Sequence, residues 1–195
     1  MWDERYAAGE FVYGREPNDF LVSVADRMPK GKVLCLAEGQ GRNAVYLAGL
    51  GYEVVGVDSS AIGLEKAQQL ARERGVKIET QVADLTTLDI GVNCWEGIVS
   101  IFCHLPSAMR KELLRKVVAG LRPGGVFIME AYTPRQLNFK TGGPSSEDLL
   151  PSLSDLKQEL EGLILQHAVE IERDVVEGSL HTGRAAVVQI VATRP

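Results

Sequence analysis

Past residue 30 the chain alternates short apolar runs with longer stretches in which apolar residues recur at helical spacing. The apolar runs predict strands at 32–37, 52–57, 77–82, 95–102 and 125–132. The stretches between them predict helices near 43–49, 60–74 and 107–120. Strands that alternate with helices are typical of a Rossmann-like, doubly wound α/β domain, in which a mostly parallel sheet carries helices on both faces.

Local signals set the ends of two of these helices. Asp58, Ser59 and Ser60 are capping candidates for the helix at 60–74. The segment LRPGG at 121–125 ends the helix at 107–120, because proline cannot continue it and glycine supplies the positive φ of a turn.

After residue 132 the pattern changes. The segment 133–152 is rich in Gly, Pro, Ser and Thr, and its length suggests a functional loop or lid near an acceptor site. A short helix follows, and then two alternating apolar runs, 163–178 and 183–194, predict an antiparallel hairpin joined through SLHT. There is no internal repeat, so we expect a single domain over 1–195.

Composition narrows the class of protein. The chain has 195 residues, 45% of them hydrophobic, which is enough to bury a sizeable core. Its net charge of -5, without a basic patch, argues against nucleic acid as a partner. The sequence shows neither a signal peptide nor an apolar run long enough to span a membrane, so a cytoplasmic, soluble protein is expected. Cys35, Cys94 and Cys103 are expected to be free thiols, because their spacing fits neither a disulfide framework nor a zinc site.

The first strand leads into a glycine turn, AEGQGRN, at 37–43. Gly39, Gly41 and Ala44 satisfy the G-x-G-x-x-G/A pattern of dinucleotide sites. Asp58 follows seventeen residues after Gly41, at the end of the next strand, where a carboxylate can accept hydrogen bonds from both hydroxyls of a ribose. NAD and S-adenosylmethionine both carry that ribose, so the pattern alone does not choose between them.

Glu38 distinguishes the two cofactors. A carboxylate beside the turn would repel a pyrophosphate, whereas it would attract the ammonium and sulfonium groups of S-adenosylmethionine. The third strand ends in Ala83, Asp84 and Leu85, where a carboxylate can accept from an adenine amino group. These residues favour S-adenosylmethionine.

Together these segments resemble class I S-adenosylmethionine-dependent methyltransferases, and more narrowly the tellurite-resistance (TehB-like) and thiopurine methyltransferases. The resemblance covers essentially the whole chain. It rests on the order and spacing of WDERYAAGEFVYGREPN, AEGQGRN, VDSS, VADL, CHLP, LRPGG and YTPRQLNFKTGGP.

The resemblance implies a seven-stranded sheet with an antiparallel last strand. It also implies cofactor contacts at Glu38, Gly39, Gly41, Asn43, Asp58, Ser59 and Asp84. The turn departs from the usual D-x-G-x-G-x-G of the family, since Cys35 replaces the acid and Ala37 the first glycine. We infer that Glu38 compensates as the partner of the cofactor's amino group.

The chemistry implied is an in-line methyl transfer, which needs alignment in a dry pocket and no metal. His104, after the fourth strand, is the candidate for proton transfer, with a loop-orienting role as the alternative. Cys103 is expected to pack, and His167 and His181 to be structural or solvent-exposed. CHLP replaces the Asn/Asp-Pro-Pro-aromatic motif of enzymes that methylate nucleobase amino groups, which disfavours DNA and RNA as substrates.

The N-terminal aromatic residues suggest a lid over the cofactor at 1–30, with Tyr13 and Gly14 nearest the sulfonium. Packing of a helix against the sheet is the alternative for Trp2 and Tyr6. Arg15 could bind a negative charge on the acceptor or pair with Glu16 at the surface.

The sequence therefore predicts a small-molecule methyltransferase whose acceptor is a thiol or a selenium or tellurium species. A nicotinamide-dependent oxidoreductase and a non-catalytic cofactor-binding module remain alternatives. The sequence leaves open whether the chain is a monomer or a homodimer.

Overall fold

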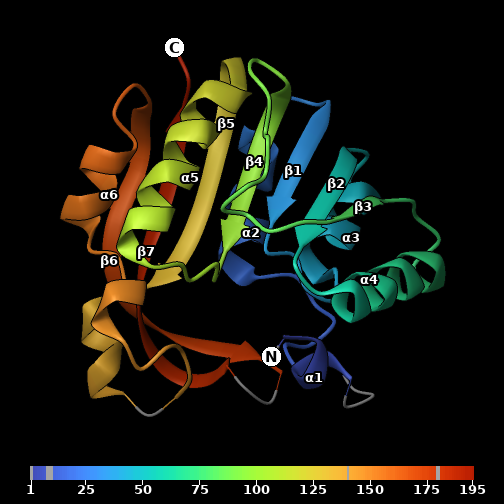
Figure 1. The fold of residues 1–195 in the computed structure, drawn as a ribbon, viewed down its shortest axis with the longest axis horizontal. Coiled ribbons are helices and arrows are strands. Elements are labelled where there is room, and N and C mark those ends of the chain that lie inside the picture. Colours follow the sequence, from blue (N-terminus) through green and yellow to red (C-terminus); the bar gives the residue numbers. More distant parts are fainter. Residues whose placement is uncertain (1, 8–10, 140, 179–180) are drawn as a thin grey trace.

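The computed structural model describes residues 2–7, 11–139, 141–178 and 181–195. In this part of the chain, seven strands form one sheet in the order β3-β2-β1-β4-β5-β7-β6 (Figure 1). The strands are β1 (Lys32–Leu36), β2 (Glu53–Asp58), β3 (Glu79–Val82), β4 (Trp95–Ile101), β5 (Leu121–Tyr132), β6 (Ile164–Glu177) and β7 (His181–Thr193). β1 to β5 pair in parallel, and β7 is antiparallel to both of its neighbours. The predicted fold class is confirmed.

Helices cover both faces of this sheet. Figure 1 shows α5 and α6 on one face and α2 and α3 on the other. The helices are α1 (Trp2–Tyr6), α2 (Asp19–Val24), α3 (Arg42–Gly49), α4 (Ala61–Glu73), α5 (Ser107–Gly120) and α6 (Leu153–Glu159), with short 3-10 turns η1 (Ala25–Arg27), η2 (Pro134–Asn138) and η3 (Glu147–Leu149). None of the described helices is long and apolar enough to cross a membrane.

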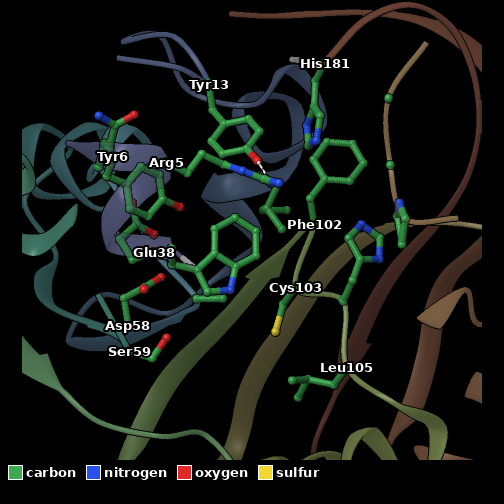
Figure 2. Close-up of a pocket in the computed structure, with 18 of the residues that line it drawn as sticks. Arg5, Tyr6, Tyr13, Glu38, Asp58, Ser59, Phe102, Cys103, Leu105 and His181 are labelled. Atoms are coloured by element: carbon green, nitrogen blue, oxygen red, sulfur yellow. Dashed lines mark hydrogen bonds between the residues drawn. The ribbon is translucent and has the colours of Figure 1, made fainter. Parts of the chain in front are cut away.

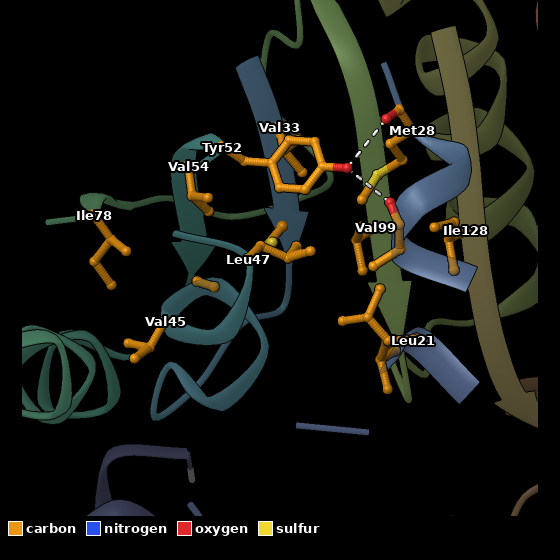
Figure 3. Packing of buried hydrophobic residues seen from close by; sticks show 14 of the residues in the cluster. Leu21, Met28, Val33, Val45, Leu47, Tyr52, Val54, Ile78, Val99 and Ile128 are labelled. Carbon is orange, nitrogen blue, oxygen red and sulfur yellow. Dashed lines mark hydrogen bonds between the residues drawn. The ribbon is translucent and has the colours of Figure 1, made fainter. Parts of the chain in front are cut away.

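The strands build two cores because successive side chains point to opposite faces. On β1, Val33 and Cys35 enter the core under α2 to α4, whereas Leu34 and Leu36 enter the core under α5 and α6. Figure 3 shows the first of these cores. There the Tyr52 hydroxyl donates to the carbonyls of Ala25 at 2.8 Å and Met28 at 3.1 Å, which satisfies its polar atom within an apolar layer.

The helix start and stop signals act as predicted. Ser60 caps α4 by accepting from the backbone N–H of Gly63 at 3.0 Å, and α5 ends at Gly120. The LRPGG segment differs in one respect, because it is assigned to β5 rather than to a separate turn. Trp95 pairs with Leu121 but Gly97 pairs with Val126, so the residues of β5 between Leu121 and Val126 bulge out of the ladder. Gly124, in this bulge, has φ +80°.

The C-terminal hairpin extends past the parallel strands. β6 pairs with β7 over its whole length, from Ile164 opposite Thr193 to Glu177 opposite His181. This confirms the predicted antiparallel hairpin, although residues 179 and 180 of its turn lie outside the described residues. The far end of the hairpin approaches the N-terminal segment, because a Cβ on Gly178 would clash with backbone atoms of Val12 and Gly14.

Candidate functional site

A pocket of about 650 Å³ opens at the carboxyl ends of β1, β2 and β4. Figure 2 shows that its walls come from distant parts of the chain: Arg5, Tyr6 and Tyr13, the ends of β1 and β2, the loop after β4, and His181. Of the predicted site residues, those that line it are Tyr13, Glu38, Asn43, Asp58, Ser59, Asp84, Leu85 and His104. Gly39, Gly41 and Ala83 shape the adjacent backbone without lining the pocket.

The glycine turn requires its glycines for space as well as conformation. Gly41 has φ +89°, and a Cβ there would lie 2.5 Å from the Cβ of Ala67 on α4. A Cβ on Gly39 would lie 2.5 Å from the Tyr6 hydroxyl. At Ala37, where the family usually has a glycine, the backbone is also left-handed, with φ +51°. The turn therefore keeps the conformation that glycine would favour, at the cost of local strain.

Asp58 is fixed by backbone donors on two segments. Its Oδ2 accepts from the N–H of Gly39 at 2.9 Å and its Oδ1 from the N–H of Ser60 at 2.8 Å. Burial raises the pKa of Asp58, and these hydrogen bonds oppose that rise. A carboxylate has about four acceptor positions, so both oxygens retain capacity for a ligand.

Glu38 caps the N-terminus of α3. Its Oε1 accepts from the backbone N–H groups of Asn43 at 3.1 Å and Ala44 at 2.8 Å. Burial raises its pKa to about 7 despite these hydrogen bonds and the nearby charge of Arg42. Glu38 also lies against the Cys35 thiol, whose pKa is raised by burial. It thus has a structural partner in addition to the ligand role predicted for it.

Asp84 follows the end of β3 and also lines the pocket. Its Oδ1 accepts from the backbone N–H of Thr86 at 2.9 Å and from the Thr86 hydroxyl at 2.8 Å, which lowers its pKa. The backbone N–H of Ala83 donates to the carbonyl of Asp58 at 2.9 Å. The ends of β2 and β3 are therefore held together, with two carboxylates facing one pocket.

The N-terminal segment covers the glycine turn. Asp3 hydrogen-bonds the Ser60 hydroxyl at the start of α4, and the Lys66 ammonium donates to the carbonyl of Tyr6. The Tyr6 ring packs over Gly39 and Gly63, and burial raises the pKa of its hydroxyl. The segment thus lies where a lid was predicted, with Tyr6 buried and Trp2 42% exposed. Closure of the lid stays a prediction.

The loop after β4 forms the opposite end of the pocket, with His104 at its centre. Its Nδ1 lies 3.3 Å from the carbonyl of Leu149, which identifies Nδ1 as the protonated nitrogen. Burial lowers the pKa of His104 to about 4, so the ring is neutral at pH 7. Nε2 has no hydrogen-bond partner among the described residues. The ring stacks on Tyr132, with centroids 5.5 Å apart.

His181 was predicted to be structural or solvent-exposed, and its side chain is only 12% exposed. It lines the pocket, with its ring centroid 4.6 Å from Tyr13, 5.0 Å from Phe102 and 5.3 Å from Tyr132. Its Nδ1 lies 3.9 Å from a carboxylate oxygen of Glu177. Sequence reasoning missed it because its direction depends on the register of the whole hairpin. Together Tyr13, Phe102, His104, Tyr132 and His181 form what we call the aromatic wall.

Arg15, which was predicted to bind the acceptor or to pair with Glu16, does neither. Arg15 pairs with Glu73 on α4, while Glu16 pairs with Arg74, so neither the pocket role nor the Arg15–Glu16 pair is present. Arg5 enters the pocket instead. Its Nη1 donates to the Tyr13 hydroxyl at 3.0 Å.

Polar side chains form a buried cluster near the aromatic wall, which we call the ion cluster. Its members are Asn18, Arg42, Glu130, Arg173, Glu177 and Gln189. Arg42 Nη2 donates to Glu177 at 2.6 Å, and Arg173 donates to both oxygens of Glu130 at 2.9 and 2.6 Å. Burial opposes the ionisation of Glu177, but the neighbouring His181 and Arg42 outweigh it and lower its pKa to about 2.

A family model described as a methyltransferase domain matches residues 33–125, from β1 to the start of β5, a span that includes the three pocket carboxylates Glu38, Asp58 and Asp84. Residues 33–125 are therefore similar to methyltransferase domains. The cofactor implied by this family is S-adenosylmethionine. The match includes the glycine turn, Asp58, Asp84, Phe102 and His104, whereas Tyr13, Tyr132 and His181 of the aromatic wall lie outside it.

Curated methyltransferases are similar to part of the chain. The chain is 28% identical over 134 residues to a glycine/sarcosine N-methyltransferase of Halorhodospira halochloris, covering 66% of this chain and 47% of that protein. The chain spans about half the length of the curated methyltransferases it matches.

Solved structures show the same fold at lower identity. One, from work on the conversion of a disulfide bond into a thioacetal group during echinomycin biosynthesis, has a TM-score of 0.79 and 20% identity, covering 99% of this chain and 90% of the other. TehB from Haemophilus influenzae has a TM-score of 0.74 and 20% identity, covering 90% and 61%. The narrower resemblance to TehB thus extends to the methyltransferase fold.

Proposed function

We propose that this chain transfers the methyl group of S-adenosylmethionine to a small-molecule acceptor with a soft nucleophile, such as a thiol or a selenium or tellurium species. One observation carries the proposal: a single pocket has carboxylates at one end and an aromatic wall at the other. The first end suits a cationic, hydroxyl-bearing cofactor, and the second suits a polarisable acceptor.

The carboxylate end fits the cofactor group by group. Asp58, with Ser59 beside it, would accept from the ribose hydroxyls. Asp84 would accept from the adenine amino group, with Leu85 against the ring. Glu38 would attract the ammonium group, although it also caps α3. The remaining predicted contacts, Gly39, Gly41 and Asn43, form the turn beneath the amino-acid part, and Tyr13 lies toward the sulfonium.

When bound, S-adenosylmethionine supplies a methyl carbon on a positively charged sulfur. The acceptor's lone pair forms the new bond to that carbon as the carbon–sulfur bond breaks, and the sulfur retains the bonding electrons. The residues of this chain bind both molecules, keep them in line and exclude water. Residues of the N-terminal segment, among them Trp2, Tyr6 and Tyr13, line the pocket together with residues 142–145 and would limit the access of water.

The state of His104 supports a soft acceptor. A histidine whose pKa is about 4 is a weak base, so it suits an acceptor that is already nucleophilic rather than a hydroxyl that must first lose a proton. The Nε2 lone pair can still accept a hydrogen bond from the acceptor and orient it. We keep His104 as the candidate for this proton contact.

Calorimetric titration tests the cofactor half of the proposal. We expect the protein to bind S-adenosylhomocysteine with micromolar affinity and NAD much more weakly. Asp58→Asn should weaken the binding of S-adenosylhomocysteine by about tenfold or more, because a charged hydrogen-bond acceptor is lost in a buried position. Asp174→Asn is the matched control, since Asp174 is exposed on β6 and outside the pocket.

Tight binding of NAD without S-adenosylhomocysteine would contradict the proposal and favour a nicotinamide enzyme. Binding of S-adenosylhomocysteine without methyl transfer from S-adenosylmethionine to thiol, selenite or tellurite acceptors would favour the non-catalytic module.

A further inference from the structure

We infer that Arg5 selects an acceptor that carries a negative charge, an inference that rests on the proposed function. Arg5 lies on α1, outside the span matched by the methyltransferase family model. Figure 2 shows its side chain reaching from α1 beneath Tyr13 toward Phe102. Its guanidinium therefore lies on the side of the pocket formed by the aromatic wall.

The contacts of Arg5 with the described residues leave most of its donors available. Nη1 donates to the Tyr13 hydroxyl at 3.0 Å, and the guanidinium carbon lies 4.8 Å from the ring centroid of Trp2. Within the residues that the structure describes, no carboxylate lies at ion-pair distance from it. A guanidinium has five N–H donors in a fixed fork that matches carboxylates and oxyanions.

Charge in the pocket is divided between its two ends. The lining carboxylates Glu38, Asp58 and Asp84 belong to the ends of β1 to β3, where the cofactor is placed. The lining residues after β4 and in the segment 142–149 carry no charge at pH 7 once His104 is neutral. An anion at this end would therefore meet no negative side chain among the described lining residues.

Arg42, the other arginine in the pocket, does not supply the same free charge. It is buried, and its ion pair with Glu177 at 2.6 Å neutralises it. Arg15 is held by Glu73 outside the pocket. Arg5 is thus the cation of the described pocket lining whose charge is not balanced by an ion pair.

These observations point to a small acceptor with an apolar or polarisable body and an anionic group. The body would pack on Phe102, His104 and His181, whose rings offer flat apolar faces. The anionic group, a carboxylate, oxyanion or thiolate, would bind the guanidinium of Arg5. The Tyr13 hydroxyl fixes the direction of that guanidinium and can itself donate to the anion.

A matched pair of probes tests the inference without turnover. 4-(Methylthio)benzoate and 4-(methylthio)benzamide have nearly the same shape, differ in charge and have a sulfur that is already methylated. Each is titrated calorimetrically into the full chain loaded with S-adenosylmethionine. We expect the anion to bind about tenfold more tightly than the amide, and Arg5→Gln to abolish that preference. Arg15→Gln, the matched control, should retain it.

Other outcomes separate the failures. Loss of the preference in Arg5→Gln with S-adenosylhomocysteine affinity unchanged supports the inference. Equal binding of the two probes by the native chain, or binding of neither, overturns it and leaves the proposed function standing. Weaker S-adenosylhomocysteine binding in Arg5→Gln with the probe preference intact also overturns it, because Arg5 would then serve the cofactor. Failure of the native chain to bind S-adenosylmethionine contradicts the proposed function itself.

Discussion

Glu38 changes its charge near neutral pH because burial raises its pKa to about 7. The ammonium group of S-adenosylhomocysteine, placed beside Glu38, binds the ionised form better, so affinity for this ligand should rise by about tenfold between pH 6 and pH 8. Asp84 does not add to this slope, because its lowered pKa keeps it ionised throughout. Calorimetry across this range checks the prediction, with Glu38→Gln as the variant that should flatten the profile.

The same residue makes a stability prediction with a defined sign. Its pKa is about 4.5 when unfolded and about 7 when folded, so the folded state binds more protons between these values. Its contribution to the free energy of unfolding is complete below pH 4.5 and is lost as the pH rises through 7, by roughly 3 kcal/mol. In urea titrations of the ligand-free protein, the free energy of unfolding should decline less with rising pH in Glu38→Gln than in the native protein. An affinity for S-adenosylhomocysteine that does not change with pH in the native protein would contradict both expectations.

The position of α3 over the sheet depends on Gly41. Gly41→Ala combines a left-handed φ with a contact of 2.5 Å to Ala67, so we expect a loss of about 2–4 kcal/mol in the free energy of unfolding and weaker cofactor binding. Gly51→Ala is the matched control, because Gly51 has φ +87° with nothing within 4 Å, and it should cost about 1 kcal/mol. Equal losses in the two variants would show that the close approach to α4 carries no cost.

Elements defined by local patterns could be predicted from the sequence. The strands, the helices α3 to α6 and the hairpin follow from apolar periodicity, and Asp58 and Asp84 follow from their places at strand ends. The N-terminal segment 1–30 was expected to be a lid or helical, but the bounds of the short helix α2 within it were not predicted, because its six residues are too few for a period to show. The segment 121–125 was predicted to be a turn but forms a bulge in β5, because proline and glycine are common in both kinds of structure.

Contacts between distant segments could not be predicted. Arg15 was expected to bind a negative charge on the acceptor or to pair with its neighbour Glu16, yet its partner Glu73 is 58 residues away. His181 was set aside because nothing near it in sequence shows that it meets Phe102 and Tyr132. His181, Phe102 and Tyr132 belong to the aromatic wall, the proposed acceptor end, so the sequence predicts the proposed cofactor end of the pocket better than this one.

At the scale of the whole molecule, the ion cluster joins the N-terminal segment, α3, β5 and the hairpin. Glu130 is fully buried and holds Arg173, so Glu130→Gln leaves a largely buried guanidinium without its main partner and should cost about 3–5 kcal/mol. Glu172→Gln, which affects the more exposed pair with Arg135, should cost less than about 1 kcal/mol. Urea denaturation measures both; similar small losses would mean that the cluster adds no stability.

β7 lies between β5 and β6 although it follows both in the chain. During synthesis on the ribosome, one hydrogen-bonding edge of β5 therefore stays unpaired until β7 has been made, and β6 cannot join the sheet before β7. β7 also brings in His181, so the pocket is completed only by the segment translated last among the strands. A chain that still lacks β7 thus exposes an unpaired edge on β5 and has no finished pocket.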